Sequence, residues 1–297
     1  MPDFRRAVVE APGKINLLLD ITGTAEDGYH TVDTVLQAID LSDIVVVSKI
    51  DGDEIRVTCS NTSVPENEEN IAYKAAMAFF KLTGVPKQGL SIHIDKTIPV
   101  QAGVAGGSAD AAAVLLALNE ILGGALSAAH LHDIGRKVGV DVPFCMAGGC
   151  QFAQGRGDIL TPLPDLPPCY FVLSKPPRGV DTAQAYRVYD SKKRSVIHPD
   201  TAAMLSAIKT GNLDGVGKAM GNVFQQVEII EEVEVLAGIY RLNKALGSVM
   251  TGSGSAVVGL YTDGVMAAEC KDYISEIVRE TFIVRPIAHG AKIIHIS

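Results

Sequence analysis

A glycine-rich stretch at residues 99–108 is the segment whose residue types and spacing most clearly suggest chemistry. It reads Pro-Val-Gln-Ala-Gly-Val-Ala-Gly-Gly-Ser and runs into an Ala/Leu-rich helix that we predict to end near residues 123–124. Glycines let backbone N–H groups approach an anion, and the N-terminus of a helix favours negative charge. Such a stretch can also be only a flexible turn. The residues that fit a phosphate cradle are Gly103, Gly106, Gly107 and Ser108.

Two standard nucleotide motifs and two kinds of metal motif are missing from the sequence. The stretch has neither the GxxxxGK[ST] of a P-loop nor the GxGxxG of a dinucleotide fold. The cysteines are five, with no CxxC spacing, and the seven histidines include no HExxH. We therefore expect buried thiols in a reducing compartment and no protein-held catalytic metal.

Composition limits the partners. The chain has 297 residues, 47% of them hydrophobic, and a net charge of −8 without a stripe of Lys and Arg. Nucleic acid is therefore an unlikely ligand class. The longest apolar run, residues 111–118, is too short to span a bilayer, and residues 1–6 lack the core of a signal peptide. We expect a cytoplasmic protein with no membrane partner.

Alternating strands and helices must position the glycine-rich stretch. Apolar patterns predict strands, and Asn70 and Ser127 are predicted N-caps of two helices that reach residues 82 and 137. The predicted strands cover residues 8–9, 15–21, 44–48, 55–59, 90–95, 170–173 and 256–261. Prolines are dense from 161 to 168, so we divide the chain into domains 1–161 and 162–297.

Three motifs together resemble those of the GHMP kinase superfamily. The first is Ala-Pro-Gly-Lys-Ile-Asn-Leu at 11–17, the second is the stretch at 99–108, and the third is Met-Thr-Gly-Ser-Gly-Ser at 250–255. The three motifs occur in the same order as in that superfamily, and together they span nearly the whole chain. The resemblance implies an α+β, two-domain GHMP kinase fold. Its N-terminal domain would be similar to ribosomal protein S5 domain 2 and its C-terminal domain ferredoxin-like, with the active site between them.

Within the superfamily, four segments resemble the 4-diphosphocytidyl-2-C-methyl-D-erythritol kinases of non-mevalonate isoprenoid biosynthesis. They are residues 14–17, Asp-Gly-Tyr-His-Thr at 27–31, Gly-Gly-Ser-Ala-Asp-Ala-Ala at 106–112, and Val-Asp-Val-Pro-Phe at 140–144. Two positions depart from the family pattern. Val104 stands where Leu is usual, and Ala109 where a second Ser is frequent, which puts a hydroxyl contact at position 109 in doubt.

The resemblance implies a catalytic pair, Lys14 and Asp141. A carboxylate can accept the proton of an alcohol that attacks the γ-phosphorus of ATP, and we assign this general-base role to Asp141. An ammonium beside it would keep the carboxylate ionised and offset charge on the transferred group, which we assign to Lys14.

The remaining candidate residues bind ligands in this interpretation. Five residues are assigned to the substrate. Tyr29 and His30 would bind the cytosine, Tyr186 would stack on its other face, and Thr182 and Asn16 would make polar contacts. The ATP set is Asn70, Lys96, Pro99, Val100, Gln101, Ala102, Gly103, Val104, Ala105, Gly106, Gly107, Ser108 and Ala109. Asn70 and Lys96 also have structural interpretations, as a helix cap and a strand-end charge. Mg²⁺ would bridge the phosphates of ATP, with Ser108 its one possible protein ligand.

The resemblance predicts a kinase that phosphorylates the 2-hydroxyl of 4-diphosphocytidyl-2-C-methyl-D-erythritol, as a monomer or homodimer. Two alternatives remain open at this point. One is another GHMP kinase, acting on mevalonate, homoserine or a sugar. The other is a non-catalytic GHMP-fold binding protein, which would not need Lys14, Asp141 and the glycine-rich stretch together.

Overall fold

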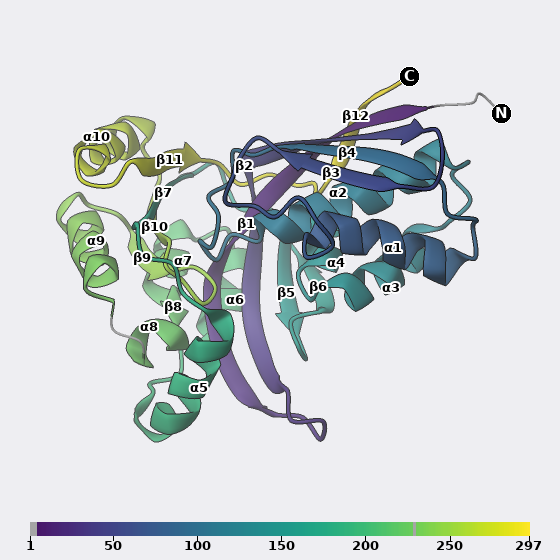
Figure 1. Ribbon diagram of the computed structural model, residues 1–297. Coiled ribbons are helices and arrows are strands. Elements are labelled where there is room, and N and C mark those ends of the chain that lie inside the picture. Colours follow the sequence, from purple (N-terminus) through teal and green to yellow (C-terminus); the bar gives the residue numbers. More distant parts are fainter. Residues whose placement is uncertain (1–4, 228–229) are drawn as a thin grey trace.

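The computed structural model describes residues 5–227 and 230–297, which form two sheets with helices packed around them (Figure 1). The larger sheet has the order β12-β1-β2-β4-β3, with β5 and β6 continuing from β2, and β8 paired to β1. Its strands are β1 (Arg6–Thr24), β2 (His30–Ile50), β3 (Ile55–Cys59), β4 (Gly89–Asp95), β5 (Cys150–Gln154), β6 (Ile159–Leu163), β8 (Gly221–Asn222) and β12 (Lys292–Ile296).

Helices α1 to α4 lie beside the larger sheet, and α2 packs directly on β1 and β2 (Figure 1). They are α1 (Ile71–Thr83), α2 (Gly106–Ile121), α3 (Ala128–Val138) and α4 (Val142–Ala147). The predicted caps are confirmed: Asn70 accepts a hydrogen bond from the N–H of Ala72, and Ser127 accepts one from that of His130. Gly84, in the left-handed conformation, ends α1.

The smaller sheet is antiparallel, with the order β11-β7-β10-β9. Its strands are β7 (Tyr170–Lys175), β9 (Gly247–Met250), β10 (Val257–Tyr261) and β11 (Glu280–Val284). The helices of this half are α5 (Thr182–Lys192), a 3₁₀ turn (Lys193–Ser195), α6 (Thr201–Lys209), α7 (Leu213–Ala219), α8 (Val223–Val227), α9 (Glu231–Leu242) and α10 (Gly264–Ser275). Strand, helices, two strands, helix and strand follow one another in the ferredoxin-like βαββαβ order. The expected α+β class is therefore confirmed.

The hairpin of β1 and β2 is longer than the sequence indicates. We expected separate strands at 8–9 and 15–21, but β1 runs through Pro12 and Gly13 as one strand of 19 residues. Register shifts between Pro12 and Lys14, and between Asn16 and Leu18, allow this, because bulges absorb a residue that cannot join the ladder. The first half of β2 has no counterpart in our predictions.

The division at residues 161/162 differs from the strand pairing in two respects. Residue 161 lies inside β6, which pairs with β5 in the larger sheet, so the chain changes sheets between Leu163 and Tyr170. At the other end, β12 pairs with β1 and returns the chain to the larger sheet. The last strand of the unit 162–297 therefore completes the edge of the larger sheet.

Two further expectations concern the cysteines and the possibility of a membrane-spanning helix. All five cysteines are free thiols, and four of them are buried while Cys59 is partly exposed. No helix among the described residues has the length and apolar character needed to cross a bilayer.

Candidate active site

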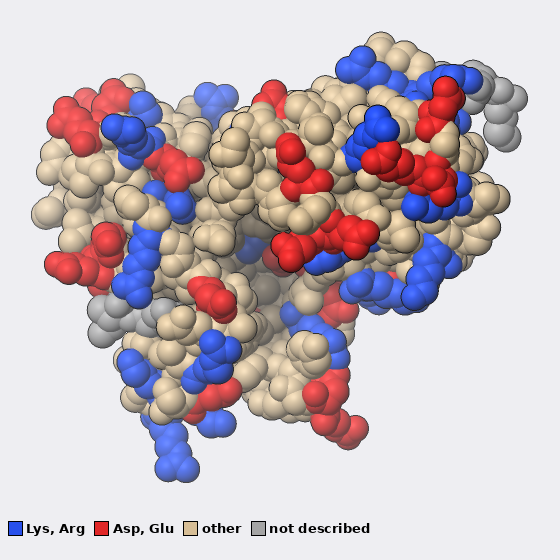
Figure 2. All heavy atoms as spheres, in the orientation of Figure 1, with Lys and Arg blue, Asp and Glu red and all other residues tan. Residues whose placement is uncertain are grey.

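A cavity of about 1070 Å³ lies between the two halves of the molecule, where the surface is hollowed (Figure 2). This volume is at the upper end for small-molecule sites. The structure brings to it every candidate residue except one, from β1, β2, α5, the loop between β4 and α2, and the positions before α1 and α4. The exception is Ala109, which is 0% exposed in the core face of α2. Its position on the helix points into the core, so Ala109 does not line the cavity, and its ATP contact stays a prediction.

At Gly103, the glycine loop (residues 99–108) approaches other backbone too closely for a side chain. Gly103 has φ +77°, and a Cβ there would lie 2.2 Å from the carbonyl oxygen of Thr251. Two residues other than glycine, Gln101 and Ala105, also have positive φ. Such conformations persist only when the surrounding structure enforces them.

Helix α2 begins at the end of this loop without a side-chain cap. Its N-cap is Ala105, so the first-turn N–H groups have no capping side chain, and Gly106, Gly107 and Ser108 line the cavity. Gly106 and Gly107 do not need a positive φ; a Cβ at Gly106 would instead lie 2.9 Å from Nζ of Lys96. Free N–H groups at a helix N-terminus bind anions. This geometry is compatible with the expected phosphate cradle, which stays a prediction.

Thr251 joins the three sequence motifs at one point. Its Oγ1 accepts from the N–H of Asn16 at 2.9 Å and lies 3.2 Å from the carbonyl oxygen of Gly103. Nζ of Lys14 donates to that same carbonyl at 2.9 Å and to Oδ1 of Asn16 at 2.6 Å. Lys14 is 4% exposed as a residue. Its ammonium is thus fixed between the first motif and the glycine loop.

Lys14 and Asn16 are two residues apart on β1, so they share a face of the strand. The amide of Asn16 also donates to Oγ1 of Thr34 at 2.8 Å. Only one amide hydrogen of Asn16 is left for the expected substrate contact. The other polar atoms of Asn16 are engaged with Lys14, Thr34 and Thr251.

Asp141 also lines the cavity, directly before α4. Although it occupies the N-cap position, its carboxylate makes no capping hydrogen bond. Among the described residues it forms no ion pair with Lys14, whose ammonium contacts Asn16 and Gly103 instead. The carboxylate lines the cavity. It is therefore available to a bound ligand.

Aromatic residues form the end of the cavity near the β1–β2 turn. The ring of His30 stacks on Tyr186 of α5 with centroids 4.7 Å apart, and Nε2 of His30 lies 2.9 Å from Oδ1 of Asp190. The guanidinium of Arg156 lies 3.9 Å from the ring centre of Tyr29. Tyr29 and Tyr186, the two rings expected to contact cytosine, therefore each already have a protein partner.

Arg156 and Asp190 are residues to which our sequence analysis assigned no role. Arg156 also forms an ion pair with Asp27, in the same segment as Tyr29. Its signal in the sequence was the Gly-Arg-Gly-Asp turn at 155–158, which gives no indication of a partner 129 positions away. On α5, Thr182 lines the cavity, and its hydroxyl lies 2.8 Å from that of Ser253.

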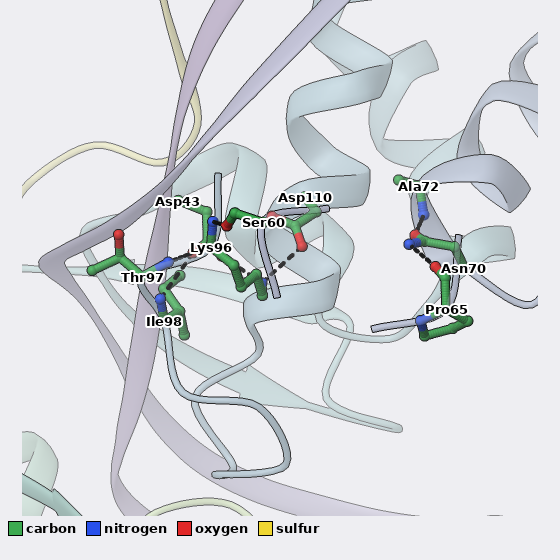
Figure 3. Close-up of polar contacts among 9 residues, drawn as sticks. All are labelled: Asp43, Ser60, Pro65, Asn70, Ala72, Lys96, Thr97, Ile98 and Asp110. Carbon is green, nitrogen blue, oxygen red and sulfur yellow. Dashed lines mark hydrogen bonds and ion pairs between the residues drawn. The ribbon is translucent and has the colours of Figure 1, made fainter. Parts of the chain in front are cut away.

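Lys96 and Asn70 both line the cavity, but their polar atoms are engaged with the protein (Figure 3). Asn70 caps α1 and donates to the carbonyl of Pro65 at 2.7 Å. Lys96 is no surface charge, since its side chain is 4% exposed and its Nζ contacts Asp43 at 2.5 Å and Asp110 at 2.8 Å. Burial opposes a charged lysine, but the carboxylates of Asp110 and Asp43 raise the pKa of Lys96 above its usual range.

Comparisons with known proteins fit this geometry. Residues 70–149 match the GHMP kinases N terminal domain, and residues 204–279 match the GHMP kinases C terminal domain. A 4-diphosphocytidyl-2-C-methyl-D-erythritol kinase from Caldicellulosiruptor bescii is 41% identical over 93% of this chain and 96% of its own length. The chain belongs to the family of 4-diphosphocytidyl-2-C-methyl-D-erythritol kinases. It is a phosphotransferase with an alcohol acceptor.

Solved structures support the same assignment of the kinase. A crystal structure of 4-(cytidine 5'-diphospho)-2C-methyl-D-erythritol kinase is 30% identical, with a TM-score of 0.78 over 94% of this chain and 98% of the other. Homoserine kinase from Cytophaga hutchinsonii reaches a TM-score of 0.77 at 17% identity, over 99% and 98% of the two chains. The second likeness shows the shared fold alone.

The kinase offers few oxygen ligands to a metal ion. Among residues 5–227 and 230–297, no group of three or more His, Cys, Asp or Glu side chains is arranged to hold one. Mg²⁺ usually takes one or two protein oxygens beside phosphates and waters. Ser108, which lines the cavity, fits that limited requirement.

Proposed function

We propose that the kinase transfers the γ-phosphoryl group of ATP to the 2-hydroxyl of 4-diphosphocytidyl-2-C-methyl-D-erythritol. The observation that carries this proposal is the convergence of the three motifs on one cavity, with Thr251 bonded to Asn16 and close to Gly103. An ammonium, a free carboxylate and an uncapped helix N-terminus line the same space. These are the groups that positioning and charge stabilisation of a phosphoryl transfer need.

Asp141 acts as general base in this mechanism. Its carboxylate has no capping bond, so it can accept the proton of the attacking hydroxyl. Lys14 supplies positive charge at a fixed point, because both of its hydrogen-bond acceptors belong to the protein. Its role is to stabilise the charge on the transferred group.

The glycine loop and the N-terminus of α2 hold the phosphates of ATP. Mg²⁺ would be held by Ser108, together with phosphate oxygens and water, and would neutralise charge on the phosphates. At the other end of the cavity, Tyr29, His30 and Tyr186 bind the cytosine. Because each ring already has a protein partner, we propose that cytosine binding displaces one of these partners.

The two alternatives would not need all the residues that line this cavity. A kinase for mevalonate or homoserine would share the ATP loop but would not need the aromatic cluster at His30 and Tyr186. A non-catalytic protein would not need a free carboxylate at Asp141. High identity to the curated relative over nearly the full length of both chains favours the cytidine substrate.

Mass spectrometry of reaction products tests the proposal. The purified protein is incubated with ATP, Mg²⁺ and 4-diphosphocytidyl-2-C-methyl-D-erythritol, and separately with mevalonate and with homoserine. We expect the mass gain of one phosphate on the cytidine substrate only. Turnover of mevalonate or homoserine instead would assign the protein to the first alternative.

A further inference from the structure

Asp43 of β2 is a fully buried carboxylate, and its residue is 0% exposed. Its Oδ1 accepts from the N–H of Thr97 at 2.6 Å and from that of Ile98 at 2.8 Å (Figure 3). These two residues directly precede the glycine loop. The entry of the loop is therefore fixed to β2 through one oxygen of Asp43.

The other oxygen of Asp43 is connected to the exit of the loop. It accepts from Nζ of Lys96 at 2.5 Å, and the same ammonium donates to Asp110 of α2 at 2.8 Å (Figure 3). Asp110 lies on the first turns of the helix that the loop enters. Gly106, at the start of this helix, lies against the same ammonium. A Cβ at Gly106 would be 2.9 Å from it, so a larger residue there would displace Lys96. A single carboxylate thus holds the residues before the loop and, through Lys96, the helix after it.

We propose that Asp43 is a positioning residue that holds both ends of the glycine loop in the geometry that binds ATP. The proposal rests on the proposed use of ATP. The loop needs such support because Gln101 and Ala105 have positive φ angles that residues with a Cβ rarely adopt. Anchors at both ends restrict the conformations that the free loop can reach, so less entropy is lost when the nucleotide binds.

The charge of the cluster supports this role. Burial raises the pKa of Asp110 to about 8, because the attraction of Lys96 does not compensate for lost hydration and the charge of Asp43. The raised pKa of Asp110 reduces the negative charge that this buried cluster carries near neutral pH, beside the loop proposed to bind phosphates.

Asp43→Asn is the decisive variant because the introduced amide has one acceptor oxygen. It can serve the N–H groups of Thr97 and Ile98 or the ammonium of Lys96, but not both. Calorimetric titration with ATP alone, without acceptor, should show affinity weaker by about tenfold or more. Titration with 4-diphosphocytidyl-2-C-methyl-D-erythritol alone should change by less than about twofold, because Asp43 does not reach that end of the cavity.

Tyr240→Phe is the matched control. It removes the buried contact of the Tyr240 hydroxyl to Ser174, 2.8 Å, in the smaller sheet. This variant should lose thermal stability and keep the ATP affinity of the unaltered protein. If Asp43→Asn weakens ATP and acceptor binding equally, Asp43 is only structural and the proposal is overturned. If the unaltered protein binds no ATP, it is the proposed function that fails.

A second pair of variants decides the matter if Asp43→Asn does not fold. Asp110→Ala removes the acceptor of Lys96 at the exit alone, and should weaken ATP binding about three- to tenfold. Asp110→Asn restores an acceptor oxygen without charge, and should recover most of that loss. Equal ATP affinities in Asp110→Ala and the unaltered protein would overturn the proposal.

Discussion

At the scale of single residues, Asp141 and Lys14 share one proton transfer in the proposed mechanism. Asp141→Asn keeps the shape of the side chain and removes the proton acceptor. We expect kcat to fall about 10²-fold or more, while ATP affinity changes little. Steady-state kinetics and calorimetry measure the two quantities. Full activity of this variant would leave a mechanism that depends on positioning alone.

Lys14→Met should also lower kcat more than affinity, since Lys14 acts on charge that develops in the transition state. Both residues act on the same step, so the double variant should lose much less activity than the product of the single losses. Multiplicative losses would show instead that the two act on separate steps.

Asp110 gives a prediction about pH. Burial raises its pKa in the folded protein from the usual 3.8 to about 8, with Lys96, Asp43, Cys59 and Cys145 as the titratable groups whose charges interact with it. Between about pH 4 and 8 the folded state thus binds a proton that the unfolded state releases, and stability decreases as pH rises through this window. Asp110→Asn cannot titrate. Relative to the unaltered protein, it should gain stability steadily from pH 5 to 8 in urea unfolding; a constant difference would contradict the raised pKa.

At the scale of elements, the loop that enters α2 should be sensitive at one glycine and tolerant at the next. A Cβ at Gly106 would lie 2.9 Å from Nζ of Lys96, whereas at Gly107 it would lie 3.2 Å from Cγ2 of Ile71. Gly106→Ala should therefore displace Lys96 and reduce ATP affinity sharply, whereas the same substitution at Gly107 should reduce it less. Calorimetry measures the affinity, and circular dichroism checks that both variants fold. If both variants bind ATP as tightly as the unaltered protein does, the loop is only a turn.

Local signals explain which elements could be predicted from the sequence. The caps Asn70 and Ser127 and the start of α2 depend on contacts a few residues away, so their residue types indicate them. The first half of β2 pairs with β5 more than 100 positions away, and β12 pairs with β1 more than 280 positions away, so neither leaves a local pattern. The same holds for the site. Lys14 and Gly103 stand in motifs, but Asp43 acts through long-range contacts that no spacing shows.

At the scale of the whole molecule, the acceptor end of the cavity is built from both halves. His30 begins β2 of the larger sheet, whereas Tyr186 and Asp190 belong to α5 on the other side (Figure 1). The contact of Nε2 with the Asp190 carboxylate requires that this nitrogen carry the proton. In the neutral imidazole, Nδ1 is then an acceptor. In that form it can accept from the amino group of cytosine, whereas uracil offers an oxygen there.

Two variants therefore separate stacking from recognition of the base edge. Tyr186→Ala removes a stacking surface and should raise KM for the cytidine substrate about 5- to 150-fold, from the 1–3 kcal/mol of base stacking. Asp190→Asn leaves both rings in place but no longer fixes the proton on Nε2 of His30, so it should lower the preference for the cytidine over the uridine form of the substrate. The preference is the ratio of the two kcat/KM values, measured with His30→Ala alongside. If Asp190→Asn keeps the ratio while His30→Ala loses it, His30 reads the base without help from the other half of the molecule.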